Sequence, residues 1–142
     1  MPQGERSAGE AASNGTQLRR CRSDPALDLV HLSRQCQGDP ELEAELLGLF
    51  QLQLLGLTAQ LSDLATLTPE LRAKFAHRLR GSALAVGAGR VACAAKAIED
   101  KALTAREPAR ANGLHLEVVS QAVAALEAAV AEAVAEIALI RS

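Results

Sequence analysis

The C-terminal stretch of the chain, residues 114–140, carries an apolar pattern that only a long helix satisfies. Apolar residues recur there at alternating spacings of three and four positions: Leu116, Val119, Val123, Leu126, Val130, Ala133, Ile137 and Ile140. This spacing lines them up along one seam of a helix, as in a coiled coil. Such a seam has to be buried against other helices, so the pattern predicts a helical bundle.

Capping residues followed by proline predict where three further helices begin. Proline is favoured at the first helical position, and Asp or Thr before it caps the free backbone N–H groups. Asp24, Asp39 and Thr68 each precede a proline, and Gly87 is placed to end the helix that Thr68 opens. The expected helices cover residues 25–35, 40–64, 69–86, 88–103 and 114–140.

Together these ranges predict an all-α fold, an antiparallel up-down four-helix bundle with a short N-terminal lid helix. A break around Pro108 and the Asn112-Gly113 pair separates the last helix from the one before it. Residues 1–24 are rich in Gly, Ser, Ala, Gln and charge and poor in apolar side chains, so we expect a flexible leader there. The bundle domain is expected over residues 25–142.

Leucine supplies much of the predicted core, because the chain has only two Phe and neither Tyr nor Trp. The apolar face expected for the helix over 40–64 consists of Leu42, Leu46, Leu49, Phe50, Leu57, Leu61 and Leu64. The leucines beyond what this face needs are Leu47, Leu52, Leu54 and Leu55. They either pack beneath the short first helix or form an exposed apolar patch for a partner.

Charge and cysteine content exclude several classes of protein. Fifteen basic and seventeen acidic residues give a net charge of −2 without a basic block, which argues against nucleic-acid binding. No apolar run reaches the roughly 18 residues of a membrane span, and the first residues lack the apolar core of a signal peptide. Three widely spaced cysteines match neither a disulfide framework nor a zinc site. We therefore expect a soluble cytoplasmic protein with reduced thiols and no metal of its own.

His77 lies about half a turn from the apolar stripe expected for its helix, and is therefore expected to face water. That stripe consists of Leu71, Phe75, Leu79, Ala83 and Val86. Arg80 and Gly81 follow His77 by three and four positions, the spacings at which helical side chains become neighbours. Glycine inside a helix costs about 0.5–1 kcal/mol relative to alanine, so Gly81 suggests that another protein approaches the backbone here.

The segment AHRLRGSA at residues 76–83, with Gly87-Ala88 downstream, resembles the histidine phosphotransfer (HPt) domains of two-component phosphorelays. The family motif is a histidine, one residue, an aliphatic residue, Lys or Arg, Gly, and Ser or Ala. The resemblance extends from about Asp24 to the C-terminus, since a lid helix and a four-helix bundle are also the family's plan. It implies that His77 accepts a phosphoryl group from the aspartyl phosphate of one receiver domain and passes it to another.

Two further residues receive roles from this resemblance. Arg80 stands where lysine is more frequent in the family, and it would bind the phosphoryl oxygens through its planar guanidinium. Glu99 occupies a position where relatives commonly carry Glu or Gln. The match implies a hydrogen bond from Nδ1 of His77 to Glu99, which leaves Nε2 as the nucleophile.

The implied partners are response-regulator receiver domains and a hybrid histidine kinase. Magnesium and its carboxylate ligands would belong to the receiver, so this chain is expected to need no cofactor and to act as a monomeric carrier without kinase activity. The partner surface is expected around His77, at Ala73, Lys74, Arg78 and Leu84.

Two other functions remain open. One is the dimerisation and phosphoacceptor domain of a histidine kinase, in which an acidic residue usually follows the histidine, whereas Arg78 follows it here. The other is a module that binds receivers or other helices without carrying phosphate. The site residues also have simpler interpretations: His77 and Arg80 as ordinary surface side chains, and Glu99 as one member of a polar face with Asp100 and Lys101.

Overall fold

The computed structural model describes residues 25–104 and 113–141, which form five helices and the turns between them, with no strand. The helices are α2 (Leu29–Gln35), α3 (Pro40–Leu61), α4 (Pro69–Val86), α5 (Gly89–Thr104) and α6 (Gly113–Arg141). The predicted all-α class is confirmed. The predicted leader at residues 1–24 and the break around Pro108 and Asn112 lie outside the described residues.

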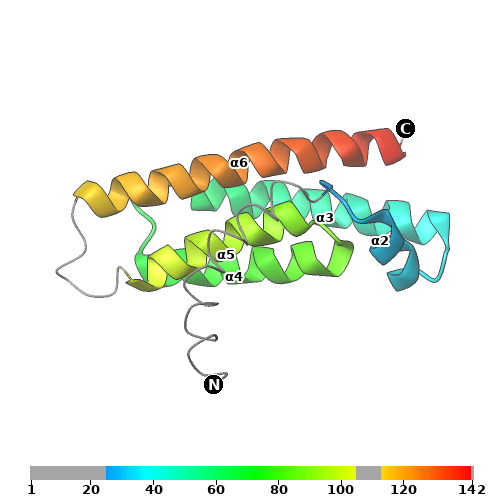
Figure 1. Ribbon diagram of the computed structural model, residues 1–142, viewed down its shortest axis with the longest axis horizontal. Coiled ribbons are helices and arrows are strands. Elements are labelled where there is room, and N and C mark those ends of the chain that lie inside the picture. Colours follow the sequence, from blue (N-terminus) through cyan, green and yellow to red (C-terminus); the bar gives the residue numbers. More distant parts are fainter. Residues whose placement is uncertain (1–24, 105–112, 142) are drawn as a thin grey trace, which may run out of the picture.

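Helices α3 to α6 pack as a four-helix bundle in which consecutive helices run in opposite directions (Figure 1). α4 packs against α3 and α5, and α6 closes the ring by packing against both α5 and α3. The short helix α2 lies at one end of the bundle against α3 and α4 (Figure 1). The up-down arrangement and the lid helix are therefore as predicted.

Aliphatic side chains make up most of the core. The apolar stripes expected for the last two helices contribute many of them. Val91, Ala95, Ile98 and Ala102 of α5 are all fully buried. The seam of α6 is buried as well, apart from its two ends: Leu116 is 49% exposed and Ile140 is only partly buried. Alternating spacings of three and four therefore identified the buried sides of these two helices.

The predicted apolar face of α3 is wrong in part. Leu47 and Leu54, which were assigned to the surplus, are completely buried, whereas Leu42 and Leu49 of the predicted face are 45% and 62% exposed. The cause is that leucines surround most of this helix, so periodicity alone does not select one side. Packing against α4 and α6 selects the side that carries Leu47 and Leu54.

The predicted start of the lid helix at Asp24-Pro25 is also wrong, because α2 begins at Leu29 with Asp28 as its cap. The Asp28 carboxylate accepts a hydrogen bond from the backbone N–H of His31 at 3.1 Å. The Asp28 N–H donates to the carbonyl of Gly87 at 2.8 Å, which ties the cap to the end of α4. Leu27 before the cap and Leu32 in the helix are both buried, an arrangement that fixes the entry of the chain into a helix.

The cysteines do not all behave as expected. Cys36 is a buried free thiol, and burial raises its pKa, with Glu43 and Asp39 adding to the shift. Cys93 is disulfide-bonded, so the expectation of reduced thiols is wrong for this residue. Within the described residues, none of the helices offers an apolar stretch that would reach across a bilayer.

Candidate functional site around His77

Local sequence signals define both ends of α4, the helix that carries His77. The hydroxyl of Thr68 accepts a hydrogen bond from the backbone N–H of Leu71 at 3.3 Å, and Pro69 occupies the first turn. Gly87 ends the helix in the left-handed conformation, with φ of 81°. An alanine Cβ at Gly87 would lie 2.9 Å from the backbone oxygen of Asp28. Glycine is therefore required at this position by conformation and by space.

The buried side of α4 differs from the predicted stripe. It consists of Arg72, Ala73, Ala76, Leu79, Ala83 and Val86. Leu71 is 43% exposed and Phe75 only partly buried, so the buried arc is turned toward His77. His77 still faces solvent, but it leans toward the neighbouring helix α5 instead of pointing straight away from the core.

Because the buried side of α4 is shifted, one residue of the predicted partner surface is buried. Ala73 is only 6% exposed and belongs to the buried side of α4, so its place on the partner surface is wrong. Lys74, Arg78 and Leu84 are exposed, as that surface requires.

A hydrogen bond between α4 and α5 fixes the imidazole of His77. Its Nδ1 lies 2.8 Å from Oε2 of Glu99, and the His77 side chain is nevertheless 70% exposed. A carboxylate can only accept, so Nδ1 donates and the neutral ring presents the lone pair of Nε2. The contact inferred from the family resemblance is therefore present in the structure.

Glu99 is suited to this positioning role by its own surroundings. Its side chain is 16% exposed, whereas its neighbour Asp100 is fully on the surface. It is therefore not an ordinary member of a solvated polar face. Its second oxygen, Oε1, lies 4.0 Å from Nη1 of Arg80, so the carboxylate lies between the imidazole and a guanidinium.

Arg80 and Gly81 lie beside the ring, on the same helix. The Arg80 side chain is 35% exposed, and its loose contact with Glu99 leaves guanidinium donors for another group. A Cβ added at Gly81 would meet no atom within 4 Å. Among the described residues, no packing contact therefore requires glycine at position 81.

A cation on α5, Lys96, was not predicted from the sequence. Lys96 lies one helical turn before Glu99 and is only partly buried, so it adds a positive charge to the helix that carries Glu99. Its spacing of three residues from Glu99 is a signal from which it could have been found. No hydrogen bond to the imidazole is observed for it.

A second missed cation supports the start of α4. Arg72 is only 2% exposed, and its Nη2 donates to the carbonyl of Leu67 at 3.1 Å. Burial lowers the pKa of Arg72, an effect that the charge of Asp63 opposes. Hydrogen bonds from Thr66 hold the pKa of Asp63 below its usual value. These contacts order the turn that leads into the His77 helix.

Over residues 25–104 and 113–141, no group of three or more His, Cys, Asp or Glu side chains is arranged to hold a metal ion.

Comparison with known proteins gives no relative, because no protein-family model, no curated protein and no solved structure matches the chain.

Proposed function

We propose that this chain is a histidine phosphotransfer protein that carries a phosphoryl group on His77 between the aspartates of receiver domains. The observation that carries the proposal is the pair formed by His77 and Glu99. Nδ1 is held by a carboxylate at 2.8 Å while the side chain remains 70% exposed, so Nε2 is both nucleophilic and reachable.

In the proposed transfer, one bond forms and one breaks. The lone pair of Nε2 attacks the phosphorus of the aspartyl phosphate, the N–P bond forms, and the P–O bond to the aspartate breaks. The receiver carboxylate leaves with the electron pair of that bond, while Nδ1 keeps its proton. The ring then carries positive charge, which the carboxylate of Glu99 partly balances. Return to a second aspartate is the same step in reverse.

Positioning and charge complementarity are the main requirements of phosphoryl transfer, and few side chains supply them here. Arg80 would donate to the phosphoryl oxygens, and Gly81 would leave space for the receiver to bring its aspartate in line. Lys74, Arg78 and Leu84 would form the docking surface around them. Magnesium would be held by the receiver. We place this exchange in the cytoplasm, with a hybrid histidine kinase upstream.

The dimerisation domain of a histidine kinase fits less well. Such domains assemble their four-helix bundle from two chains, whereas α3 to α6 complete the bundle within one chain. The basic Arg78 after the histidine also differs from the acidic residue usual in those domains.

Incubation with a receiver domain carrying labelled aspartyl phosphate tests the proposal. We expect acid-labile, alkali-stable label on the wild-type chain and none on His77→Gln. His31→Gln is the matched control, because it removes a histidine from the lid helix and should leave labelling intact. Equal labelling of His77→Gln would overturn the carrier role, and absence of label from a panel of receivers would leave only a binding module.

A further inference from the structure

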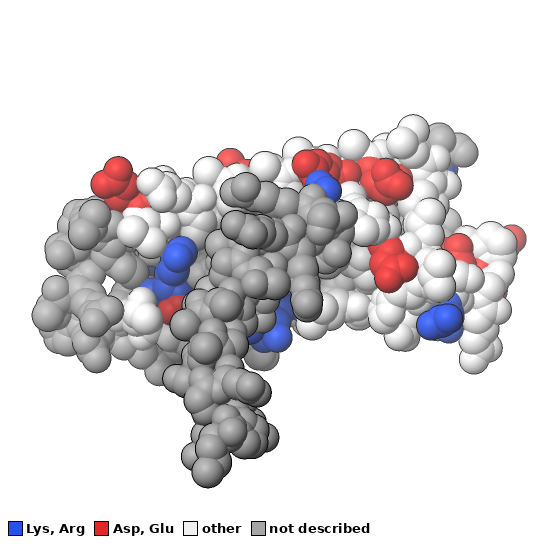
Figure 2. Space-filling model, viewed as in Figure 1, with Lys and Arg blue, Asp and Glu red and all other residues white. Residues whose placement is uncertain are grey.

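The charges of the bundle are divided between its two long sides. α3 and α6 carry three and four glutamates, and their only Lys or Arg is Arg141. α4 and α5 carry four and three Lys or Arg residues against three acidic ones. In Figure 2, acidic side chains gather along the upper edge of the visible face, over α6. Glu132 of α6 pairs with Arg90 of α5, and the remaining six glutamates still leave α3 and α6 with an excess of negative charge.

Exposed leucines lie on the same acidic side. Leu49, Leu52 and Leu55 of α3 are 62%, 72% and 47% exposed, although a helix of this kind normally turns such residues inward. Three exposed leucines within two turns of one helix form a contiguous apolar surface, and such surfaces on soluble domains mark interaction sites.

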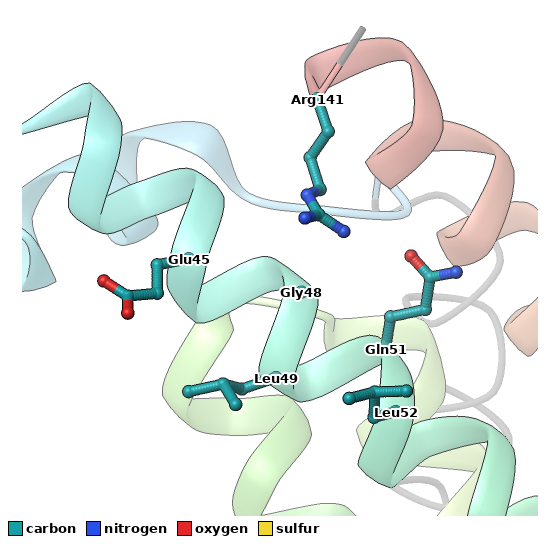
Figure 3. A pocket seen from close by; sticks show the side chains of 6 residues that line it. All are labelled: Glu45, Gly48, Leu49, Gln51, Leu52 and Arg141. Carbon is teal, nitrogen blue, oxygen red and sulfur yellow. The ribbon is translucent and has the colours of Figure 1, made fainter.

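Two shallow hollows lie beside these leucines where α3 packs against α6, and we call them together the α3–α6 groove. The first is lined by Glu45, Gly48, Leu49, Gln51, Leu52 and Arg141 (Figure 3). The second is lined by Leu55 and Thr58 of α3 and by residues of α6 that include Glu127, Val130 and Val134. Apolar side chains predominate in the second hollow, and each hollow is lined by one carboxylate, Glu45 in the first and Glu127 in the second.

Arg141 closes one end of the groove. Its side chain reaches from the end of α6 toward α3 (Figure 3), and a Cβ at Gly48 would lie 3.1 Å from its Cζ. Glycine at position 48 therefore leaves room for the guanidinium to lie close to α3. Beyond this end, the charged side chains that line the groove, Glu45 and Glu127, are acidic.

We propose that the α3–α6 groove docks an amphipathic helix of another protein, with apolar residues on one face and Lys or Arg along its flanks. A helix in a groove between two helices is a common recognition mode, in which apolar anchors give affinity and flanking charges give orientation. The exposed leucines of α3 would contact the apolar side chains of the docked helix. Glu45 and Glu127 would attract the Lys or Arg side chains along its flanks.

Charge argues against the other occupants of such a groove. A second copy docked through the same surface would bring Glu45 and Glu127 of both chains together, with Arg141 as the one cation that lines the groove in each. An anionic membrane surface would be repelled for the same reason. The groove also lies between α3 and α6, away from the α4 and α5 surface around His77, so both surfaces can be occupied together.

A designed peptide of leucine and lysine in a helical repeat serves as the probe, and the same peptide with glutamate in place of lysine is its control. Binding of the fluorescent peptides to the full chain is followed by anisotropy at low salt. The lysine peptide should bind and the glutamate peptide should not. Leu49→Gln with Leu52→Gln should weaken binding of the lysine peptide by about tenfold or more, since both anchors lose apolar contact.

Three further variants test whether peptide binding is specific to the groove. Leu103→Gln removes a leucine that is 43% exposed on α5 and should leave peptide binding unchanged. Glu45→Gln with Glu127→Gln should weaken binding a few-fold and reduce its dependence on salt. His77→Gln should have no effect, which separates this result from the phosphotransfer proposal.

Three results would overturn the proposal. Equal binding of the lysine and glutamate peptides, or binding insensitive to Leu49 and Leu52, would show that the groove is not the site. Self-association of the chain that is lost on substituting these leucines would show that a second copy occupies the groove. Sedimentation of the wild type and the double variant measures the latter.

Discussion

The two long sides of the bundle differ in what they expose. The side formed by α4 and α5 presents His77 among basic residues, with a carboxylate fixing the ring. The side formed by α3 and α6 presents leucines bordered by glutamates. One buried core thus supports two surfaces of opposite charge. A short motif marks the first in the sequence, whereas the second resembles ordinary core until packing separates buried from exposed leucines.

The largest expected effect tests which leucines of α3 belong to the core. Leu54→Ala should lower the free energy of unfolding by about 2–5 kcal/mol, because Leu54 is fully buried and its loss leaves a cavity. Leu52→Ala, two residues earlier and 72% exposed, should change it by no more than about 0.5 kcal/mol. Denaturant unfolding of both variants measures the difference. Similar losses would mean that the two sides of α3 are wrongly assigned.

The next effect concerns the ring of His77. Glu99→Ala should slow phosphoryl transfer by about tenfold, because Nδ1 loses a charged hydrogen-bond partner that fixes the tautomer. Glu99→Gln keeps an oxygen acceptor and should restore part of the rate. Single-turnover transfer from a phosphorylated receiver measures both rates, and wild-type kinetics in Glu99→Ala would remove the positioning role.

Replacing each of two glycines of the α4 region with alanine should change the free energy of unfolding in opposite directions. Gly87→Ala should destabilise by at least about 1–2 kcal/mol, since it places a Cβ at positive φ and against the Asp28 carbonyl. Gly81→Ala should stabilise by about 0.5–1 kcal/mol, because it lies in open space inside a helix. Thermal unfolding measures both.

A bulkier residue at position 81 separates stability from function. Gly81→Leu should keep helicity while impairing transfer, because the larger side chain occupies the space left for the receiver. Undiminished transfer in this variant would show that the receiver does not approach the backbone at Gly81.

The smallest effect distinguishes the two surfaces by charge. Lys74→Glu should slow transfer from a receiver a few-fold at low salt and less at high salt, because it reverses a charge beside His77. Glu45→Lys reverses a charge on the other side and should leave the rate unchanged. Equal slowing by both variants would indicate a general charge effect instead of a local docking surface.

Much of the fold was predictable because local signals and packing agree. Asp39-Pro40, Thr68-Pro69 and Gly87 set helix ends through their own backbone chemistry, so the structure reproduces them. The Asp24-Pro25 signal failed, since the lid helix begins where Asp28 bonds to Gly87 and where Leu27 and Leu32 are buried. That choice depends on contacts between distant segments, which a local pattern does not contain.

The candidate site was predictable in its chemistry and less so in its packing. The contact between His77 and Glu99 was implied by the resemblance to histidine phosphotransfer domains, and the structure contains it. Ala73 was wrongly assigned to the partner surface, because alanine occurs on both the buried and the exposed sides of helices. Arg72 was not predicted to be buried, because charged residues are seldom fully buried.

The atom that carries the phosphoryl group tests the account most directly. After transfer from a receiver, phosphorus and nitrogen NMR of the labelled chain identifies both the residue and the ring nitrogen. The geometry of His77 and Glu99 predicts phosphorus on Nε2 of His77, with a proton retained on Nδ1. Phosphorus on Nδ1 of His77, or on any other residue, would contradict the account.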